Sequence, residues 1–389
     1  MKIIPYGNHF VDKEDAIALG KSTHTKFLTS GKYGVKFHDK LKKYLNSKYL
    51  VLSSSGTSAL HLAFMAIGLN KDDAIIMPSI NFIASYNMAT QLNAKIYLAD
   101  VDPYTGQMTP KNVEKCIKDN KIKKIKCILT MYLGGSPENI KSFSSLKKKY
   151  KSFLIEDSCH AFGSSYLFNK KKTMVGCNKH SDISTFSFHP VKSIATGEGG
   201  CITTNSKKIY EKVLELKNHG MIKNKKKHWD YDVVSNGYNY RISDINCALG
   251  ISQLKKINKF SIKRNKIAKI YRQELMAYSD YLTFPNYSDD NYSCYHLLIL
   301  NFKFSKLKKN KEYFFSEMLK NKILFQFHYK PIYKFKIFNN YLKMKLNFPG
   351  SEYFYKNCLS APIFYNLEKN KLKYVIYKIK LFINKYRKY

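Results

Sequence analysis

The feature of this chain that most constrains its fold is an alternation of short aliphatic runs with longer helical stretches. The short runs, rich in β-branched and aliphatic residues, occur at residues 48–53, 74–79, 95–101, 126–133 and 153–158, and a stretch with helical spacing follows each of the first four. A parallel strand can pair with the next one only after the chain has crossed back over the sheet, usually as a helix. The alternation therefore predicts an α/β domain with a mostly parallel sheet.

The pattern changes in the second half of the chain. Two closely spaced strands are predicted at residues 182–189 and 200–205, with a glycine-rich loop between them, and a long helical run begins near residue 243. Beyond it, the sequence predicts a strand at YHLLILNF, a helix at EYFFSEMLKN and an amphipathic helix from about Glu368. Because 389 residues exceed what one core usually supports, we expect a large domain over residues 1–265 and a smaller α+β domain over residues 266–389.

The chain carries a formal charge of +39, from 67 Lys and Arg against 28 Asp and Glu. Only four of the basic residues are arginines, and the lysines are spread along the whole chain. Proteins that read bases or clamp phosphates specifically favour arginine, because its planar guanidinium forms paired hydrogen bonds. We interpret the charge as a compositional trend and expect no nucleic-acid partner, although acidic small substrates would still be attracted.

Cysteine usage and hydropathy bear on the cellular compartment. The eight cysteines are scattered singly, which fits a reducing environment. No apolar stretch reaches the ~20 residues that a membrane helix needs, and the first residues lack the apolar core of a signal peptide. We expect a cytoplasmic protein that does not insert into a membrane.

The segment from Asp182 to Thr204 is the most informative one, because Lys192 is the only lysine in it. An apolar strand precedes Lys192 and a glycine-rich turn follows it, so its amine can be shielded from water. Desolvation lowers the pKa of a lysine toward the neutral amine that carbonyl chemistry requires. Lys192 is therefore a candidate Schiff-base lysine; the alternative is an ordinary lysine that extends from a loop end into solvent.

Asp157 stands at the end of the hydrophobic run FLIED, where open α/β sheets present ligand-contacting groups. A carboxylate there suits the pyridine nitrogen of pyridoxal 5′-phosphate (PLP), because a protonated nitrogen makes the ring an electron sink. His160, three residues later, could stack on the cofactor or bond near it. The alternatives are a helix cap for Asp157 and an ordinary core position for His160.

A third signal is SSSGTSAL at residues 53–60, where a strand ends in small residues and a helix begins. The first amides of a helix form an anion site, which here would hold the cofactor phosphate at Thr57, with Ser187 from the lysine strand. Phe82 could lie on the face of the cofactor ring. The alternatives are a plain Ser/Thr helix cap and a core aromatic residue.

Other cofactor motifs are missing from the sequence. It contains no G-x-G-x-x-G after a predicted strand, no P-loop, no H-E-x-x-H and no C-x-x-C. Cys177 with His180, and Cys159 with His160, could suggest zinc, but the second pair is adjacent in sequence and would point to different faces. We expect no metal, and PLP fits the three signals better than another cofactor.

These residues resemble the fold-type-I PLP aminotransferases that act on nucleotide-linked 4-keto sugars. The resemblance covers nearly the whole chain, through IPYGNHFVDKED, KFLTSG, SSGTSALHLA, ADVDP, IEDSCHAFGSSY, HPVKSIATGEGG, NHGM, GYNYRISDINCALGISQLKK, FHYKPIYKF and CLSAPIF. It implies the fold of aspartate aminotransferase, with a large, mostly parallel-sheet domain and a smaller α+β C-terminal domain. IPYG, HPVK with TGEGG, and FHYKPIY are similar to the branch of the family that acts in pseudaminic-acid pathways.

The resemblance also implies roles for individual residues. Lys192 would hold the cofactor covalently and move a proton between the amino-acid Cα and the cofactor, and Asp157 would hold the pyridinium. The other cofactor contacts would be Gly56, Thr57, Phe82, His160 and Ser187, with Asn239 supplied by the second subunit of a homodimer. The contacts to the sugar nucleotide would be Tyr6, Lys26, Phe27, Leu28, His328, Tyr329 and Lys330.

The implied reaction is a transfer of the amino group of L-glutamate to the C4 ketone of a UDP-linked 4-keto-6-deoxy-N-acetyl sugar. Related PLP sugar dehydratases carry histidine in place of the lysine, so Lys192 favours amino transfer over dehydration. Two alternatives stay open. One is the same fold acting on another 4-keto-6-deoxy sugar, carried by dTDP or GDP; the other is a PLP-fold protein that has become a regulator or a basic binding module.

Overall fold

The computed structural model describes residues 3–224 and 226–388, and its largest feature is a seven-stranded sheet. Six of the strands run in the same direction, and only β9 is antiparallel to its neighbours. The predicted mostly parallel sheet is thereby confirmed. The strands are β1 (Tyr49–Ser53), β2 (Ala74–Pro78), β3 (Lys95–Ala99), β4 (Cys127–Met131), β5 (Phe153–Asp157), β8 (Ile183–Ser187) and β9 (Gly200–Thr204), in the order β1-β9-β8-β5-β4-β2-β3.

The direction of β9 follows from its connection to β8. Residues 188–199 contain no helix that could carry the chain back across the sheet, so β9 returns antiparallel beside β8. It pairs with β1 on its other side, so that Gly200 lies opposite both Ser53 and Ser187. The carboxyl ends of β1 and β8 are therefore held close together.

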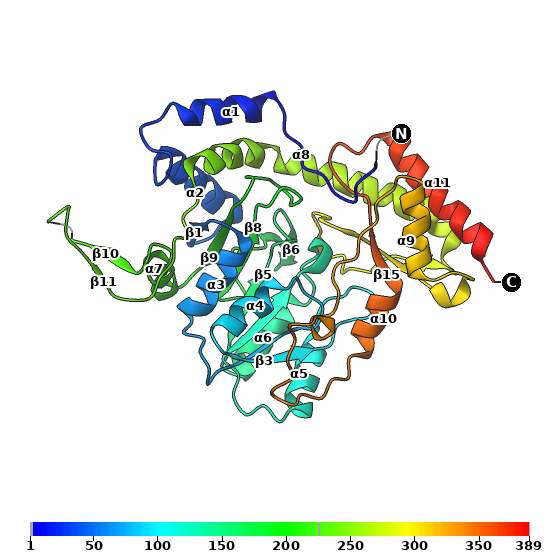
Figure 1. The fold of residues 1–389 in the computed structure, drawn as a ribbon, viewed down its shortest axis with the longest axis horizontal. Helices are drawn as coiled ribbons and strands as arrows, with labels where there is room; N and C mark the ends of the chain where they lie inside the picture. Colours follow the sequence, from blue (N-terminus) through cyan, green and yellow to red (C-terminus); the bar gives the residue numbers. More distant parts are fainter. Residues whose placement is uncertain (1–2, 225, 389) are drawn as a thin grey trace.

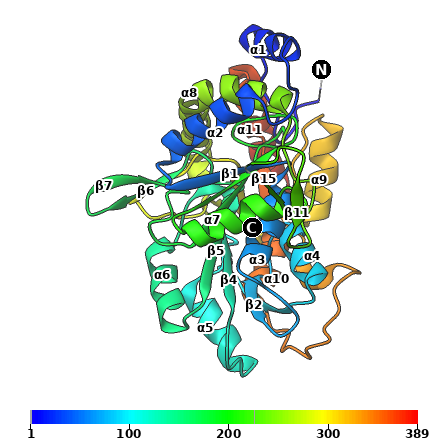
Figure 2. The same cartoon turned by 90° about the vertical axis from the view of Figure 1, so that its left-hand side faces the viewer.

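Helices cover both faces of this sheet (Figures 1 and 2). Successive strand residues point to opposite faces, and Ile75 and Ile76 of β2 accordingly belong to two different buried clusters. The cluster that contains Ile75 includes side chains of α3 (Gly56–Ala66), α4 (Ala84–Gln91) and α7 (Lys207–Leu216). The cluster that contains Ile76 includes side chains of α5 (Pro110–Asp119) and α6 (Ile140–Lys149).

The helix α8 (Asp244–Leu275) is 32 residues long and connects the two halves of the molecule. In its first part, Cys247 and Leu254 pack in a cluster with α2 (Lys32–Leu45). In its second part, Ile267 and Tyr271 pack in the core of the C-terminal region. The helix α1 (Lys13–Thr23) also contacts α8 (Figure 1). The expected boundary at residue 266 falls inside this continuous helix, and the division of the chain there stays a prediction.

The C-terminal region contains the strand and the two helices predicted for it. A three-stranded sheet of β12 (Leu282–Thr283), β14 (Leu298–Phe302) and β15 (Cys358–Ala361) packs with α9 (Lys311–Lys320) and α11 (Lys369–Tyr386). Ile4, near the chain start, pairs with Ile323 and belongs to the same core. By contrast, α10 (Pro349–Asn357) packs its Phe354 against the large sheet.

The remaining elements are short. They are β6 (Ser165–Phe168), β7 (Lys171–Met174), β10 (Met221–Lys223), β11 (Tyr231–Val233), β13 (Asn291–Tyr292) and 3-10 turns at Leu133–Gly135, Met276–Tyr278, Phe304–Lys306 and Ile332–Lys334. The β10–β11 hairpin projects from the body of the molecule (Figure 1), and the β6–β7 hairpin projects in the turned view (Figure 2). Over the residues described, no helix is both long and apolar enough to cross a membrane.

Candidate active site

A cavity of about 360 Å³ lies at the carboxyl ends of the parallel strands. Its lining includes the last residues of three strands, Met131 of β4, Asp157 of β5 and Ser187 of β8. Gly56 and Thr57, at the start of α3, also line it. These groups meet because parallel strands present their carboxyl ends at one edge of the sheet, where open α/β folds bind ligands.

Asp157 ends β5 and is 3% exposed. Its Oδ1 accepts a hydrogen bond of 3.2 Å from the backbone N–H of Cys159. Burial raises the pKa of the Asp157 carboxyl, while the hydrogen bonds from Cys159 and the nearby Lys192 amine act to lower it. The element that follows β5 is the strand β6, so Asp157 does not cap a helix. A cationic group held against Asp157 would favour its ionised form.

Lys192 lies on the loop between β8 and β9, and its backbone N–H donates to the His189 carbonyl over 2.9 Å. Its side chain lines the cavity. Burial lowers the pKa of its amine, although the acidic groups of Cys159 and Asp157 act in the opposite direction. The neutral amine is thereby favoured, and in that form it can attack a carbonyl carbon or accept a proton.

The start of α3 provides an anion-binding end to the cavity. Ser55 Oγ accepts a hydrogen bond of 3.0 Å from the Ser58 N–H, and Ser58 Oγ accepts one of 2.9 Å from the Ser55 N–H. The N–H groups of Gly56 and Thr57, which have no partner inside the helix, are therefore left for a ligand.

Residue 56 can only be glycine in this arrangement. A Cβ there would lie 2.7 Å from the Cβ of Ser187 and 3.3 Å from the Sγ of Cys159. The backbone of the helix start therefore packs directly on the end of β8. Such a bare helix start, with hydroxyl groups beside it, suits a phosphate group.

Imidazole and phenol side chains form another part of the cavity wall. His160 is 1% exposed, and its Nε2 lies 2.9 Å from the Tyr329 hydroxyl. The ring of His296 lies 4.2 Å from that of His160, measured between centroids. The Nδ1 of His328 lies 2.9 Å from the hydroxyl of Ser360.

The three histidines are neutral in this setting. Burial lowers the pKa of His328 to about 3 and the pKa of His160 and His296 well below the ordinary range. A positive charge on the Lys192 amine would lower all three pKa values further. The histidines can therefore orient ligands through hydrogen bonds, but they do not bind anions as cations.

Ten of the predicted site residues come together at this cavity. Phe82, for example, is 52% exposed at the cavity and its ring lies 5.6 Å from that of Tyr329. The complete set is Tyr6, Gly56, Thr57, Phe82, Asp157, His160, Ser187, Lys192, His328 and Tyr329.

Five predicted site residues do not line this cavity, and all five are exposed: Lys26, Phe27, Leu28, Asn239 and Lys330. Lys26, Phe27 and Leu28 lie on the segment before α2, and Asn239 pairs with Asn218. The amine of Lys330 lies 5.3 Å from the ring centre of Phe335.

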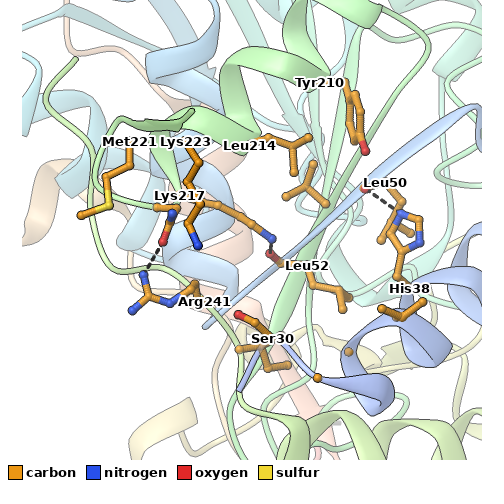
Figure 3. A pocket seen from close by; sticks show the side chains of 16 residues that line it. Ser30, His38, Leu50, Leu52, Tyr210, Leu214, Lys217, Met221, Lys223 and Arg241 are labelled. Atoms are coloured by element: carbon orange, nitrogen blue, oxygen red, sulfur yellow. Dashed lines mark hydrogen bonds between the residues drawn. The ribbon is translucent and has the colours of Figure 1, made fainter. Parts of the chain in front are cut away.

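A second cavity, of about 740 Å³, is lined by Ser30 and Gly31, just after Leu28, and by Asn218, the partner of Asn239 (Figure 3). Arg241 Nη1 donates to Asn218 Oδ1 over 2.6 Å, and Lys217 Nζ donates to the Leu52 carbonyl over 3.4 Å. Among its described lining residues there are basic side chains, such as Lys223, but no carboxylate. This cavity therefore lacks the acid and amine pair that the first cavity contains.

Nine residues that line the first cavity were not predicted as site residues, and among them are the chemically active side chains of Cys159, Glu198 and His296. Cys159 lies in the motif of Asp157, and Glu198 lies in the motif of Lys192. Their closeness in sequence to these two residues was the signal that could have predicted them as site residues. His296 precedes the apolar strand β14, and no local pattern distinguishes it from a core histidine. Only packing brings it to His160.

The residues of the first cavity fit PLP. The carboxylate of Asp157, the amine of Lys192 and the bare helix start at Gly56 match the ring nitrogen, the aldehyde and the phosphate of that cofactor. In the described part of the chain, no group of three His, Cys, Asp or Glu side chains is placed to hold a metal ion.

Comparisons with known proteins agree with this chemistry. A model of the DegT/DnrJ/EryC1/StrS aminotransferase family matches residues 10–380. The UDP-4-amino-4,6-dideoxy-N-acetyl-beta-L-altrosamine transaminase of Campylobacter jejuni is 34% identical over 375 residues, which cover 96% of each chain. The GDP-perosamine synthase of Escherichia coli O157:H7 is 36% identical over 276 residues, 71% of this chain and 72% of its own.

Among solved structures, Helicobacter pylori PseC, an aminotransferase involved in the biosynthesis of pseudoaminic acid, superposes with a TM-score of 0.88. It is 29% identical in sequence, and the match covers 98% of this chain and 100% of that one.

Proposed function

This chain belongs to the DegT/DnrJ/EryC1/StrS aminotransferase family, and from that premise we propose that it moves an amino group from L-glutamate to C4 of a UDP-linked 4-keto-6-deoxy-N-acetyl sugar. It is a PLP-dependent sugar aminotransferase. The amino sugar would serve the biosynthesis of a pseudaminic-acid-type surface glycan.

The observation that carries the proposal is that Lys192 and Asp157 line one cavity, at which a helix start is also free to bind a phosphate. PLP, when bound, supplies an electron sink for the charge that develops at the donor Cα. The Asp157 carboxylate would keep the ring nitrogen protonated, and the amides of Gly56 and Thr57 would bind the phosphate. Lys192 Nζ, in its neutral form, would accept the proton from the Cα of glutamate and return it to the cofactor, and in the second half of the reaction it would carry a proton from the cofactor to C4 of the sugar.

The proposed sugar rests on the relatives. The Campylobacter jejuni enzyme, whose name specifies a UDP-linked 4-amino-4,6-dideoxy sugar, matches this chain over 96% of its length. The second candidate is a GDP-linked 4-keto-6-deoxy sugar, because the GDP-perosamine synthase of Escherichia coli is 36% identical over a shorter segment. Tyr6, His328 and Tyr329, which line the cavity, would contact the sugar in either case.

The experiment that distinguishes these sugars uses the holoenzyme with glutamate and each candidate 4-keto sugar carried by UDP, GDP or dTDP. NMR of the products identifies the aminated carbon and its configuration. We expect an amine at C4 of the UDP-linked N-acetyl sugar. Turnover of only the GDP-linked sugar would favour the second candidate, and amination of none would refute the proposal.

The proposed enzyme is a homodimer in which Asn239, Lys26, Phe27 and Leu28 act in the partner's site. Two observations support this arrangement. These residues are exposed and do not line the cavity of their own chain. Large apolar side chains are also exposed nearby, with Phe27 57% and Val35 63% accessible. Such side chains are usually covered in an assembly.

A mixing experiment tests the exchange of Asn239 between subunits. Lys192→Ala and Asn239→Ala proteins are each expected to be nearly inactive. In a mixed dimer, the intact Lys192 of one chain would meet the intact Asn239 of the other, so co-refolded variants should regain activity. Light scattering gives the mass of each species, and failure of the mixture to regain activity would place Asn239 in its own chain's site.

A cytoplasmic location is also part of the proposal. All eight cysteines are free thiols, and six of them are buried. Free thiols are maintained in reducing compartments.

A further inference from the structure

Arg264 carries a buried charge that no carboxylate balances. It lies within α8 and is 4% exposed. Its guanidinium makes one long hydrogen bond, of 3.5 Å, from Nη1 to the Tyr295 carbonyl, and its Nε has no partner. Over the described residues, no acidic side chain forms an ion pair with it. An unpaired charge in a protein interior is costly, so a counter-ion at this place would be stabilising.

A small cavity adjoins this guanidinium. Its volume is about 10 Å³, which is room for one particle close to the size of a water molecule. Carboxylates, phosphates and sulfates are too large for it. The lining comes from the N-terminal arm (Asn8, His9, Phe10), from the loop that carries Lys192 (Pro190, Lys192, Ser193, Ala195), from α8 (Gln253, Phe260, Arg264) and from Tyr365.

Three aromatic rings form one wall of this cavity. The ring centre of Tyr365 lies 4.8 Å from that of Phe10 and 4.7 Å from that of Phe260. The rings of Phe10 and Phe260 meet edge to face, 6.0 Å apart. Aromatic edges carry partial positive charge and aromatic faces partial negative charge, so an anion in this cavity would lie at the ring edges.

The polar groups nearby include a basic side chain and an amide that is already hydrogen-bonded. The Lys192 side chain lines this cavity as well as the larger one. The Nε2 of Gln253 donates to the Phe10 carbonyl over 2.9 Å and to Asp15 Oδ2 over 2.8 Å. The same Asp15 oxygen lies 2.8 Å from the amine of Lys256. The nearby Asp15 carboxylate is therefore paired with Lys256 through Oδ2, while its Oδ1 has no hydrogen-bond partner, and among the described residues no ion pair joins it to Arg264.

We propose that this cavity binds a single monoatomic anion of the chloride class, with the Arg264 guanidinium as its counter-ion. The site is distinct from the cavity that fits PLP, because Arg264 lines the smaller cavity and not the larger one, although Lys192 lines both. The anion would connect the N-terminal arm, the Lys192 loop and α8. It would thereby stabilise the loop that carries Lys192.

Thermal unfolding of the full chain, with and without PLP, tests the proposal. Each sample is measured in potassium chloride or bromide, and in potassium gluconate of equal ionic strength. We expect the halides to raise the Tm of the wild-type protein by roughly 2 °C or more relative to gluconate. The Arg264→Gln variant should show no such difference.

Arg272→Gln is the matched control. Arg272 lies on the same helix, and its guanidinium donates to the Pro285 carbonyl over 3.0 Å and lies 4.8 Å from the Phe284 ring centre. This variant removes the same charge but should keep the halide response. An equal halide response in Arg264→Gln would overturn the proposal.

Crystals of the wild-type protein grown in bromide give a readout that needs no variant. A peak in the anomalous map beside Arg264 is expected. A map with no peak there, and a water molecule in the cavity, would overturn the proposal even if Arg264→Gln failed to fold.

Discussion

The hydroxyl of Tyr329 lies 2.9 Å from Nε2 of His160. His160 stands on the turn that follows Asp157 and strand β5. This contact joins the segment after α9 to the strand end that carries the buried carboxylate. Both side chains line the cavity, so the hydrogen bond fixes two parts of its wall relative to each other. Tyr329 is a proposed sugar contact and His160 a proposed cofactor contact, so this hydrogen bond is placed to orient the acceptor sugar relative to the cofactor.

Removal of the Tyr329 hydroxyl should weaken substrate binding more than chemistry. A typical hydrogen bond contributes about 0.5–1.5 kcal/mol, so Tyr329→Phe should raise the KM for the sugar nucleotide roughly two- to tenfold with a smaller change in kcat. Tyr333→Phe is a suitable control, because its hydroxyl donates over 2.8 Å to Glu352 on the exposed side of the same segment. Equal effects of the two variants would contradict this role.

Two lysines with lowered pKa values allow a direct test of the reactive amine. Burial lowers the pKa of both Lys192 and Lys217. Lys217, however, lines the second cavity, whose described lining residues include no carboxylate. Lys192→Ala should lose the visible absorbance of covalently held PLP and reduce transfer by at least roughly a thousandfold. Lys217→Ala should keep both. Turnover by Lys192→Ala near the wild-type rate would refute the assignment.

The neighbours Glu156 and Asp157 should show opposite phenotypes, because successive strand residues point to opposite faces. Glu156 is 1% exposed and accepts hydrogen bonds from the hydroxyls of Tyr132 and Ser184, at 2.8 and 2.6 Å. Glu156→Gln should therefore lower the free energy of unfolding by about 1–3 kcal/mol and leave PLP binding unchanged.

Asp157→Asn should instead leave stability nearly unchanged and weaken turnover and PLP binding strongly, because the amide cannot balance a protonated ring nitrogen. Urea unfolding and PLP titration of both variants measure the two effects. Retention of full turnover by Asp157→Asn would contradict the proposed role of the carboxylate.

His328 should make the stability of the cofactor-free protein depend on pH. Burial lowers its pKa from 6.5 to about 3, so between these values the unfolded chain binds a proton that the folded chain does not. Stability contributed by neutral His328 is therefore lost as the pH falls below 6.5.

The variant His328→Gln removes this dependence. Between pH 6.5 and about pH 4, the wild-type protein should lose roughly 3 kcal/mol more unfolding free energy than the variant. Urea unfolding at several pH values measures the difference. Parallel pH profiles for the two proteins would show that His328 is solvated in the folded state.

Local sequence was sufficient for the elements that carry the proposed cofactor contacts. The run FLIED placed Asp157 at a strand end, SSSGTSAL placed a helix start at Gly56, and the isolated lysine identified the loop of Lys192. Each of these features depends on neighbours within a few residues. The position of β9 between β8 and β1 was less accessible, because its pairing with β1 joins segments far apart in the chain.

The sequence alone determined the mostly parallel sheet and the residue types at its carboxyl edge, because hydrophobic periodicity and turn chemistry act over short distances. Only the tertiary structure decided which distant side chains share a wall. It brought His296 against His160, left Asn239 and Phe27 outside the cavity of their own chain, and buried Arg264 without a carboxylate. Such contacts depend on how helices and strands pack together, and no local pattern in the chain specifies that packing.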